Sequence, residues 1–330
     1  MLEKNSVTLQ DVKDAAERIR PYIRRTPLLR EATLDKLLGC QVYFKPEMLQ
    51  ITGAFKLRGA LSKILTLSPE ELARGIVTSS SGNHAQACAY AGQLLGIKVT
   101  VIVPDNTPHL KVSNARRMGA NVILWEHTYA KRWEKVRQEV AEHGYTIVHA
   151  FEDYTVMAGQ GTIALEIMED LPDVETVVVP IGGGGLISGI STAIKESNPK
   201  IRVVGVEPAN SDGFLASRNA GHRIRIQSKP TIADGITCSE PSERPYEIVE
   251  RYVDEIVAVE ENDIREAVRQ IAREAHLVAE PTSSVVVGAM LAKKIKVRPD
   301  EKVAFVLTSG NWDIENIGKI FKDEPVPGVL

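Results

Sequence analysis

Short runs rich in β-branched residues alternate with stretches of helix length along the whole chain. A first series of predicted strands comprises Gly75–Ser79, Lys98–Pro104, Asn121–Trp125 and Thr146–His149. A second series comprises Thr176–Pro180, Arg202–Glu207, Asp254–Val259 and Lys302–Leu307. This rhythm indicates βαβ units and parallel sheets. Because the irregular stretch Gly221–Arg244 breaks the second series, two open sheets are favoured over one barrel.

Helices are predicted between these strands. Ser68-Pro69-Glu70-Glu71 has the pattern of a capping box with proline at the first helical position. Further helical segments are expected at Ile187–Glu196, Glu261–Ala275 and Ser283–Lys294. The chain is thus predicted to be of the α/β class.

Composition narrows the range of partners. The chain has 330 residues, of which 43% are hydrophobic and 25% charged, which is typical of a globular protein. Its formal charge of −3 gives no reason to expect nucleic acid or a membrane as partner, so a small-molecule substrate or ligand is predicted. It lacks an apolar run of about eighteen residues and an N-terminal apolar core, which predicts a cytoplasmic location. Cys40, Cys88 and Cys238 have no CxxC spacing and are expected to be small buried hydrophobes.

Four consecutive glycines, Gly182 to Gly185, follow the predicted strand Thr176–Pro180 and precede a helix. Glycines at such a turn allow backbone N–H groups to converge beside a helix N-terminus, which makes this a candidate phosphate cradle. No Gly-Lys-Ser/Thr follows, so the pattern is not a P-loop. The alternative is a flexible turn without a ligand.

Two polar loops also follow predicted strands. They are Thr78-Ser79-Ser80-Ser81-Gly82-Asn83-His84 and Thr308-Ser309-Gly310-Asn311-Trp312-Asp313. Open α/β sheets bind ligands at the carboxyl ends of their strands, and the first loop offers groups suited to a carboxylate. The alternative for each loop is an ordinary helix cap.

Lys56 lies in the string Thr52-Gly53-Ala54-Phe55-Lys56-Leu57-Arg58-Gly59-Ala60, between a glycine-led turn and an alanine-rich helix. A partly desolvated lysine there would serve as an amine nucleophile toward an aldehyde. The alternative is a solvated surface lysine.

Together, these motifs resemble the fold-type II pyridoxal-phosphate enzymes, and among them the serine/threonine dehydratase and serine racemase group. The resemblance extends from Arg25-Thr26-Pro27-Leu28 to Asp313. It implies two open, twisted, mostly parallel sheets flanked by helices. It also implies a small domain, residues 50–149, inserted in a large cofactor-binding domain made of residues 1–49 and 150–330.

The resemblance also implies roles for particular residues. Lys56 would hold pyridoxal 5'-phosphate as a Schiff base and then act as general base. The other cofactor contacts would be Phe55 beside the ring, Asn83 at its hydroxyl, Gly182, Gly183, Gly184 and Gly185 at the phosphate, and Thr308 at the pyridine nitrogen. The substrate carboxylate would be surrounded by Ser80, Ser81, Asn83 and His84.

The implied activity is that of an ammonia-lyase. A neutral hydroxyl at Thr308 does not keep the pyridine nitrogen protonated as a carboxylate would, which favours loss of water from L-threonine or L-serine to give 2-oxobutanoate or pyruvate and ammonia. Ser81 leaves serine racemisation open, because the matching residue in racemases returns a proton on the opposite face. Met48 and Ala54 depart from the family pattern, which leaves hydroxyaspartate open as substrate. A third reading is a nucleotide-binding module in which Lys56 is incidental.

A metal site and an oligomer are also expected from the resemblance. Glu207 and the Ser211 carbonyl match a segment that binds a divalent cation in racemase-like members, so Mg²⁺ or Ca²⁺ is predicted, with a monovalent cation as alternative. Gly213 stands where a second acidic ligand would be. The short form without a regulatory region is expected, as is a homo-oligomer, a dimer or tetramer.

Overall fold

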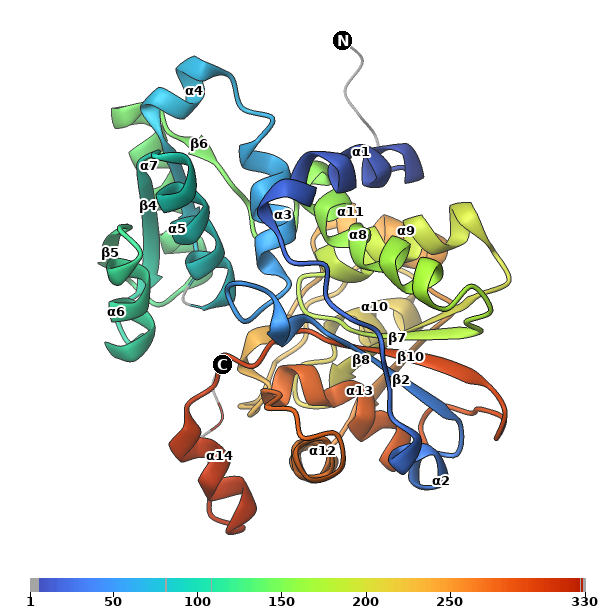
Figure 1. Cartoon of the computed structure of the whole chain (residues 1–330). Helices are drawn as coiled ribbons and strands as arrows, with labels where there is room; N and C mark the ends of the chain where they lie inside the picture. The colour runs from blue at the N-terminus through green and yellow to red at the C-terminus, as the bar shows by residue number, and fades with distance from the viewer. Residues whose placement is uncertain (1–5, 81, 108, 327, 329–330) are drawn as a thin grey trace.

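The computed structural model describes residues 6–80, 82–107, 109–326 and 328, which form two mostly parallel sheets flanked by helices (Figure 1). The strands are β1 Leu29–Arg30, β2 Gln41–Pro46, β3 Ile76–Ser79, β4 Val99–Pro104, β5 Asn121–Trp125, β6 Thr146–Ile147, β7 Thr176–Pro180, β8 Arg202–Pro208, β9 Glu255–Val259 and β10 Lys302–Leu307. The six-stranded sheet has the order β1-β2-β10-β7-β8-β9 and the four-stranded sheet the order β5-β4-β3-β6. Only β1 runs antiparallel to its described neighbour, so the predicted fold class is confirmed.

Helices cover both sheets. They are α1 Leu9–Ile19, α2 Asp35–Leu38, α3 Lys56–Ile64, α4 Pro69–Arg74, α5 Asn83–Leu95, α6 His109–Arg117, α7 Tyr129–His143, α8 Tyr154–Asp170, α9 Gly185–Ser197, α10 Gly213–Ala220, α11 Glu243–Tyr252, α12 Glu261–Glu274, α13 Pro281–Leu291 and α14 Ile314–Phe321. Ser68 caps α4 through the predicted capping box. The helix predicted to reach Lys294 ends earlier, at Leu291, and Lys293 beyond it adopts a φ of 55°.

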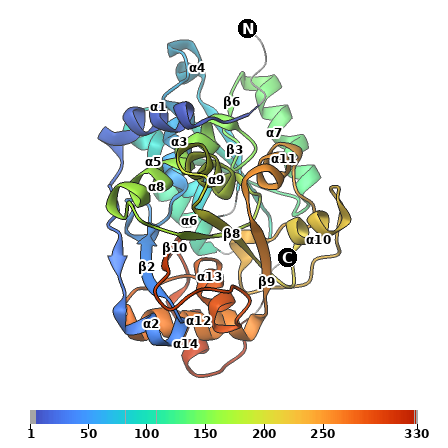
Figure 2. The same cartoon turned by 90° about the vertical axis from the view of Figure 1, so that its right-hand side faces the viewer.

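The large sheet is buried on both faces, as parallel sheets require. Along β7, Val177 and Val179 join the core under α1, α8 and α9, whereas Val178 joins the core over α12 and α13. Residues of β10 alternate between the two cores in the same way. Figure 2 shows the two helical layers on opposite sides of this sheet.

The sequence did not predict β2 or the short β1. Strand β2 pairs in parallel with β10, from Gln41 opposite Lys302 to Pro46 opposite Leu307. It contains Lys45, which is fully buried and hydrogen-bonds Glu166 at 2.5 Å. A charged residue interrupts the apolar run by which a central strand is recognised. The counter-charge that allows Lys45 to be buried comes from α8, far along the chain, so the local sequence does not reveal the burial.

The four-stranded sheet lies between α3 and α8 in the chain, so the smaller unit is inserted in the larger. Helix α3 joins the two units, since it packs against α8 of the larger and α5 of the smaller. The limits 50–149 stay a prediction. All three cysteines are free and buried, as predicted.

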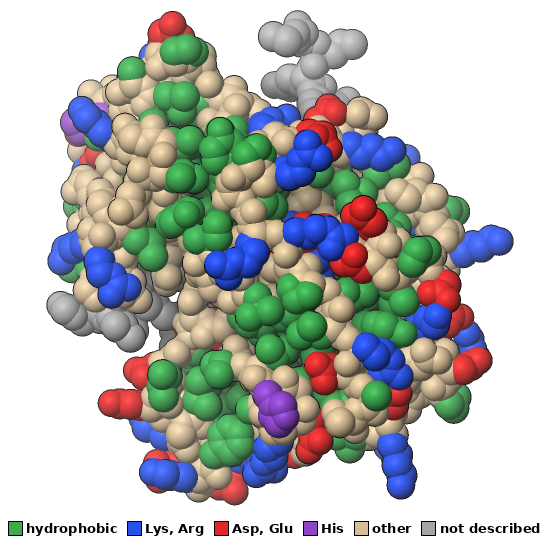
Figure 3. Space-filling model, viewed as in Figure 1, with side chains coloured by type: hydrophobic (Ala, Val, Ile, Leu, Met, Phe, Trp, Pro, Cys, Tyr) green, Lys and Arg blue, Asp and Glu red, His purple; other side chains and the backbone are tan. Residues whose placement is uncertain are grey.

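Charge is dispersed over the surface seen in Figure 3, where acidic and basic side chains are interspersed. Within the described part of the chain, no helix combines the length and apolarity that crossing a bilayer would require.

A buried ion-pair network fixes the start of α3. The Arg58 guanidinium is fully buried, and its Nε donates to Glu47 at 2.8 Å while its Nη1 donates to Glu166 at 2.6 Å. Thr26 and Thr162 accept further hydrogen bonds from it. Because Glu166 also pairs with Lys45, two cations and two carboxylates balance one another in the interior. The network ties the first turn of α3 to the end of β2 and to α8.

Replacing Arg58 with Leu should lower the free energy of unfolding by about 3–5 kcal/mol, because two buried carboxylates lose a counter-charge. Urea unfolding followed by circular dichroism measures this. The matched control is Arg25→Leu, which removes a half-exposed arginine from its pairs with Glu169 and Asp170 and should cost about 0–1 kcal/mol. Equal losses in the two variants would contradict the role given to the buried network.

Candidate active site

One cavity of about 260 Å³ lies between the two units, at the carboxyl ends of their strands. Strand order explains the position, because β2, β10 and β7 are neighbours and the segments that follow them meet at one edge. The predicted residues that line the cavity are Phe55, Lys56, Ser80, Asn83, His84, Gly182, Gly183, Gly184, Gly185 and Thr308. Ser81, also predicted here, lies outside the described residues.

Lys56 is the first residue of α3 and is half-buried in the cavity wall. Its Nζ donates a hydrogen bond to the carbonyl oxygen of Ala150 at 3.0 Å and lies 5.0 Å from the centre of the Phe55 ring. Loss of hydration lowers the pKa of Lys56 to about 8, and the nearby Cys88 opposes this shift. The lysine is therefore neutral in a larger fraction of molecules near neutral pH than a solvated lysine would be.

The glycine run connects β7 to α9. Gly184 has a φ of 83°, and the helix begins at the next residue. A Cβ atom at Gly183 would lie 2.4 Å from the Phe151 ring, so the loop has no room for a side chain there. The first turn of α9 leaves backbone N–H groups without helical partners at the cavity wall. These features fit a phosphate group.

The loop after β3 and the start of α5 bring Ser80, Asn83 and His84 to the cavity wall. The His84 ring is buried, with Nε2 3.0 Å from the carbonyl oxygen of Val148. Burial, and next the charge of Lys56, lower the pKa of His84 to about 3. His84 is therefore a neutral imidazole and does not offer a carboxylate a positive charge.

Thr308 follows β10 and is held by its neighbours. Its hydroxyl lies 2.9 Å from the hydroxyl of Ser283 in α13, and its carbonyl accepts a hydrogen bond from Phe55 N at 3.0 Å. The second contact links the end of β10 directly to the residue before Lys56. The positions of Lys56 and Thr308 are thus coupled through the backbone.

Sequence reasoning missed several polar residues that line the cavity, above all Glu280, Asn311, Arg132 and Asp234. Asn311 belongs to the polar loop predicted after Lys302–Leu307, but no local pattern assigns this asparagine a role. Glu280 stands at the N-cap position of α13, before Pro281, but its side chain makes no capping hydrogen bond, and a single glutamate before a helix carries no functional signal by itself. Its place in the cavity follows only from the tertiary fold.

Around Glu207 the structure shows a helix cap. Its two carboxylate oxygens accept hydrogen bonds from Phe214 N at 3.0 Å and Leu215 N at 2.8 Å, at the start of α10. Burial raises the pKa of Glu207 to about 8. A Cβ atom at Gly213 would lie 2.4 Å from the carbonyl oxygen of Cys238, which explains why no acidic side chain stands there. The cation at Glu207 and Ser211 stays a prediction.

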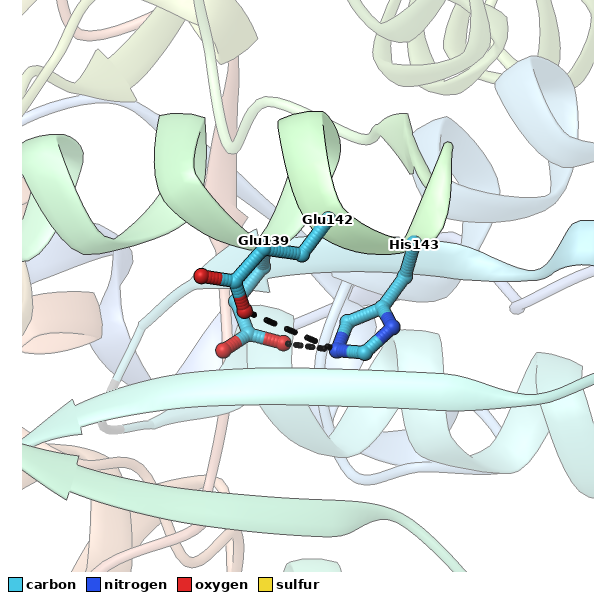
Figure 4. Close-up of side chains that lie close together, drawn as sticks. All are labelled: Glu139, Glu142 and His143. Atoms are coloured by element: carbon cyan, nitrogen blue, oxygen red, sulfur yellow. Dashed lines mark ion pairs between the residues drawn. The ribbon is translucent and has the colours of Figure 1, made fainter.

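A different cluster lies on the surface of α7, where Glu139, Glu142 and His143 bring their side-chain ligand atoms within 4.8 Å of one another (Figure 4). The Glu139 carboxylate also pairs with Lys135 at 2.8 Å, so it has a counter-charge within the protein. None of these residues is among the described residues that line the cavity.

Lys56 should titrate apart from the other lysines. Reductive ¹³C-methylation followed by NMR over a pH series is expected to show one lysine resonance, absent from the Lys56→Ala variant, with a midpoint near 8, because burial disfavours the charged amine. Lys131 serves as the reference, since its hydrogen bond with Glu134 raises its pKa. A Lys56 resonance with a midpoint above about 10, the range of a solvated lysine, would contradict the desolvated state of this residue.

Comparison with known proteins agrees with this geometry. Residues 19–309 match the family described as pyridoxal-phosphate dependent enzymes. An L-threonine ammonia-lyase of Thermotoga maritima is 45% identical over 95% of this chain and 78% of that protein. Among solved structures, a threonine deaminase of T.th. has a TM-score of 0.87 and 40% identity, covering 93% of this chain and 99% of that one. Serine racemase of Dictyostelium discoideum has a TM-score of 0.88 and 36% identity, with the same coverage. The chain therefore belongs to the pyridoxal-phosphate dependent enzyme family.

Proposed function

We propose that this protein is a pyridoxal-phosphate dependent ammonia-lyase that converts L-threonine, L-serine or both to 2-oxobutanoate or pyruvate and ammonia by elimination of water. The observation that carries the proposal is the placement of a desolvated lysine, Lys56, in one cavity with the glycine loop at the start of α9. An amine nucleophile and a phosphate cradle are the two features that a phosphorylated aldehyde requires. The relatives named as threonine ammonia-lyase and threonine deaminase support the same reaction class.

The residues present fit pyridoxal phosphate. Lys56 would hold it covalently, the Gly182–Gly185 loop would bind its phosphate, and Phe55, Asn83 and Thr308 would contact its ring. Once bound, the cofactor supplies an electron sink for the pair left behind when the α-hydrogen of an amino acid is removed.

Lys56 would remove that hydrogen. Its lowered pKa leaves part of the amine neutral near neutral pH, and only the neutral amine accepts a proton. The α-hydrogen and the β-hydroxyl together leave as water, and the enamine product then hydrolyses to a 2-oxo acid and ammonia. Phe55 and Ala150 restrict the position of the amine before the reaction.

The carboxylate of the substrate would lie at the loop before α5. Ser80 and the N-terminus of α5 offer neutral hydrogen-bond donors there. His84 would lie beside the carboxylate as a neutral ring, and Ser81 is proposed as a further contact of the carboxylate. A β-hydroxy amino acid with one carboxylate meets these groups without requiring a further cation.

Further properties are proposed with the activity. We place the enzyme in the cytoplasm and expect a homo-oligomer, dimer or tetramer. We further propose that Mg²⁺ or Ca²⁺ binds near Glu207 and Ser211. Elimination takes precedence over racemisation because Thr308 offers the ring nitrogen a hydroxyl rather than a carboxylate.

Replacing Lys56 with Ala should reduce 2-oxo acid formation from L-threonine by at least about a thousandfold, since the general base alone contributes about 10²–10⁴-fold and covalent attachment is lost as well. A coupled assay for 2-oxobutanoate measures the rate. Lys63→Ala is the matched control, because Lys63 lies on the same helix and pairs with Asp153 at 2.9 Å. Retained activity in the Lys56 variant would show that another lysine does the chemistry.

The product formed from L-serine distinguishes lyase from racemase. We expect pyruvate to form faster than D-serine, both quantified from one reaction by chiral chromatography and a pyruvate assay. The panel should include L-threonine and hydroxyaspartate, each with Mg²⁺ and with chelator. D-serine as the main product would favour the racemase reading.

A further inference from the structure

A chain of side-chain hydrogen bonds crosses the cavity between the two units. Asn311, after β10, donates from Nδ2 to the carbonyl oxygen of Thr52 at 2.7 Å and to Asn83 Oδ1 at 2.9 Å. Asn83, at the start of α5, donates from its own Nδ2 to Glu280 Oε1 at 3.2 Å. The chain therefore connects the turn before Lys56 with the loop that carries Asn83.

The direction of each bond follows from chemistry. A backbone carbonyl only accepts, so the Asn311 atom that faces Thr52 must be the amide nitrogen. That nitrogen has two hydrogens, and the second one goes to Asn83. The Asn83 atom that receives it is therefore the amide oxygen. The orientation of both amides is thus fixed by the network, although amide nitrogen and oxygen look alike by shape.

The Asn83 nitrogen consequently faces Glu280, which also lines the cavity. One hydrogen of this nitrogen goes to the Glu280 carboxylate, which as an anion only accepts. Of the hydrogen bonds formed among the described residues, none uses the other hydrogen of Asn83 Nδ2. Asn83 lines the cavity, so this hydrogen is available to a ligand there.

The two partners of Asn83 are themselves held in place. Gly53 has a φ of 70°, and a Cβ atom at this position would lie 2.4 Å from Asn311 Oδ1. The glycine of the turn before Lys56 therefore makes room for the Asn311 amide. On the other side, the Ser309 hydroxyl donates to the same Glu280 oxygen that Asn83 contacts. Gly53 and Ser309 thus restrict the side-chain positions of Asn311 and Glu280, the two partners of Asn83.

We propose that Asn311 is a positioning residue that holds the Asn83 amide as a hydrogen-bond donor toward the cavity, so that the ligand group received there is an acceptor oxygen. This inference rests on the proposed function, in which that oxygen is the ring oxygen of pyridoxal phosphate. A donated hydrogen bond favours the deprotonated form of such an oxygen and lowers its pKa. Asn311 acts through Asn83 and does not need to touch the ligand.

The test uses the visible absorption of the pyridoxal-phosphate loaded enzyme over a pH series. Asn311→Asp keeps the shape but removes both donated hydrogens and places a negative charge beside the Asn83 oxygen, so the Asn83 amide loses the contact that fixes its orientation. The pH at which the visible band titrates should rise by about one to two units, the loss expected for a hydrogen bond to a charged group. Asn311→Ala, which adds no charge, should shift the midpoint in the same direction.

Two further variants make the result specific. Asn316→Asp is the control for added charge, because Asn316 lies on α14 and its oxygen faces the Lys319 amine at 3.4 Å; its midpoint should match that of the unaltered enzyme. Asn83→Ala should shift the midpoint by itself, and adding Asn311→Asp to it should cause no further shift, because the second residue acts through the first.

The outcomes separate the two proposals. An unaltered enzyme that takes up no pyridoxal phosphate and does not turn over would overturn the proposed function. If the enzyme binds the cofactor and is active, an unchanged midpoint in both Asn311 variants would overturn the positioning role. A full additional shift from Asn311→Asp in the Asn83→Ala background would also overturn it, since that shift would come from charge alone.

Discussion

The arrangement of the cavity depends on the buried ion pairs of the Arg58 guanidinium. It lies in the first turn of α3 and reaches Glu47, the residue after β2, and Glu166 in α8. Removing a charge from water is costly, and the cost is met only when counter-charges and hydrogen bonds are placed around it. The network therefore allows one position for the start of α3, and Lys56 is the residue at that start.

The same helix shows why this matters. The apolar side chains of α3, such as Leu57 and Leu61, belong to the core of the smaller unit, whereas Arg58 is bound to the larger one. Helix α3 is thus shared, and Lys56 sits at the junction where hydration is low. Low hydration lowers the pKa of the amine toward the range in which it accepts protons. The packing that stabilises the fold and the chemistry of Lys56 have one physical origin.

Much of the fold could be predicted from the sequence, because buried parallel strands are continuous apolar runs. The buried strands Thr176–Pro180 and Lys302–Leu307 were located to the residue, as was the mostly exposed edge strand Asn121–Trp125. The same reasoning failed at β2, where buried Lys45 is compensated by Glu166 far along the chain.

The candidate site divides in the same way. Segments with a local signature, the glycine run, the serine loop and the Lys56 turn, were recognisable, and residues from all three line the cavity. Glu280 and Asn311 were not given roles, because their partners lie far away in the sequence. His84 was expected beside a carboxylate, but its burial as a neutral ring depends on Val148 and Lys56, which no local pattern reveals.

Lys56 is the residue that we propose binds the aldehyde cofactor. The most direct measurement is borohydride reduction of the loaded enzyme, followed by proteolysis and mass spectrometry of the labelled peptide. We expect a single pyridoxyl-phosphate adduct, on the peptide that contains Lys56. An adduct on a different lysine, or a protein that carries no adduct after incubation with pyridoxal phosphate, would contradict it.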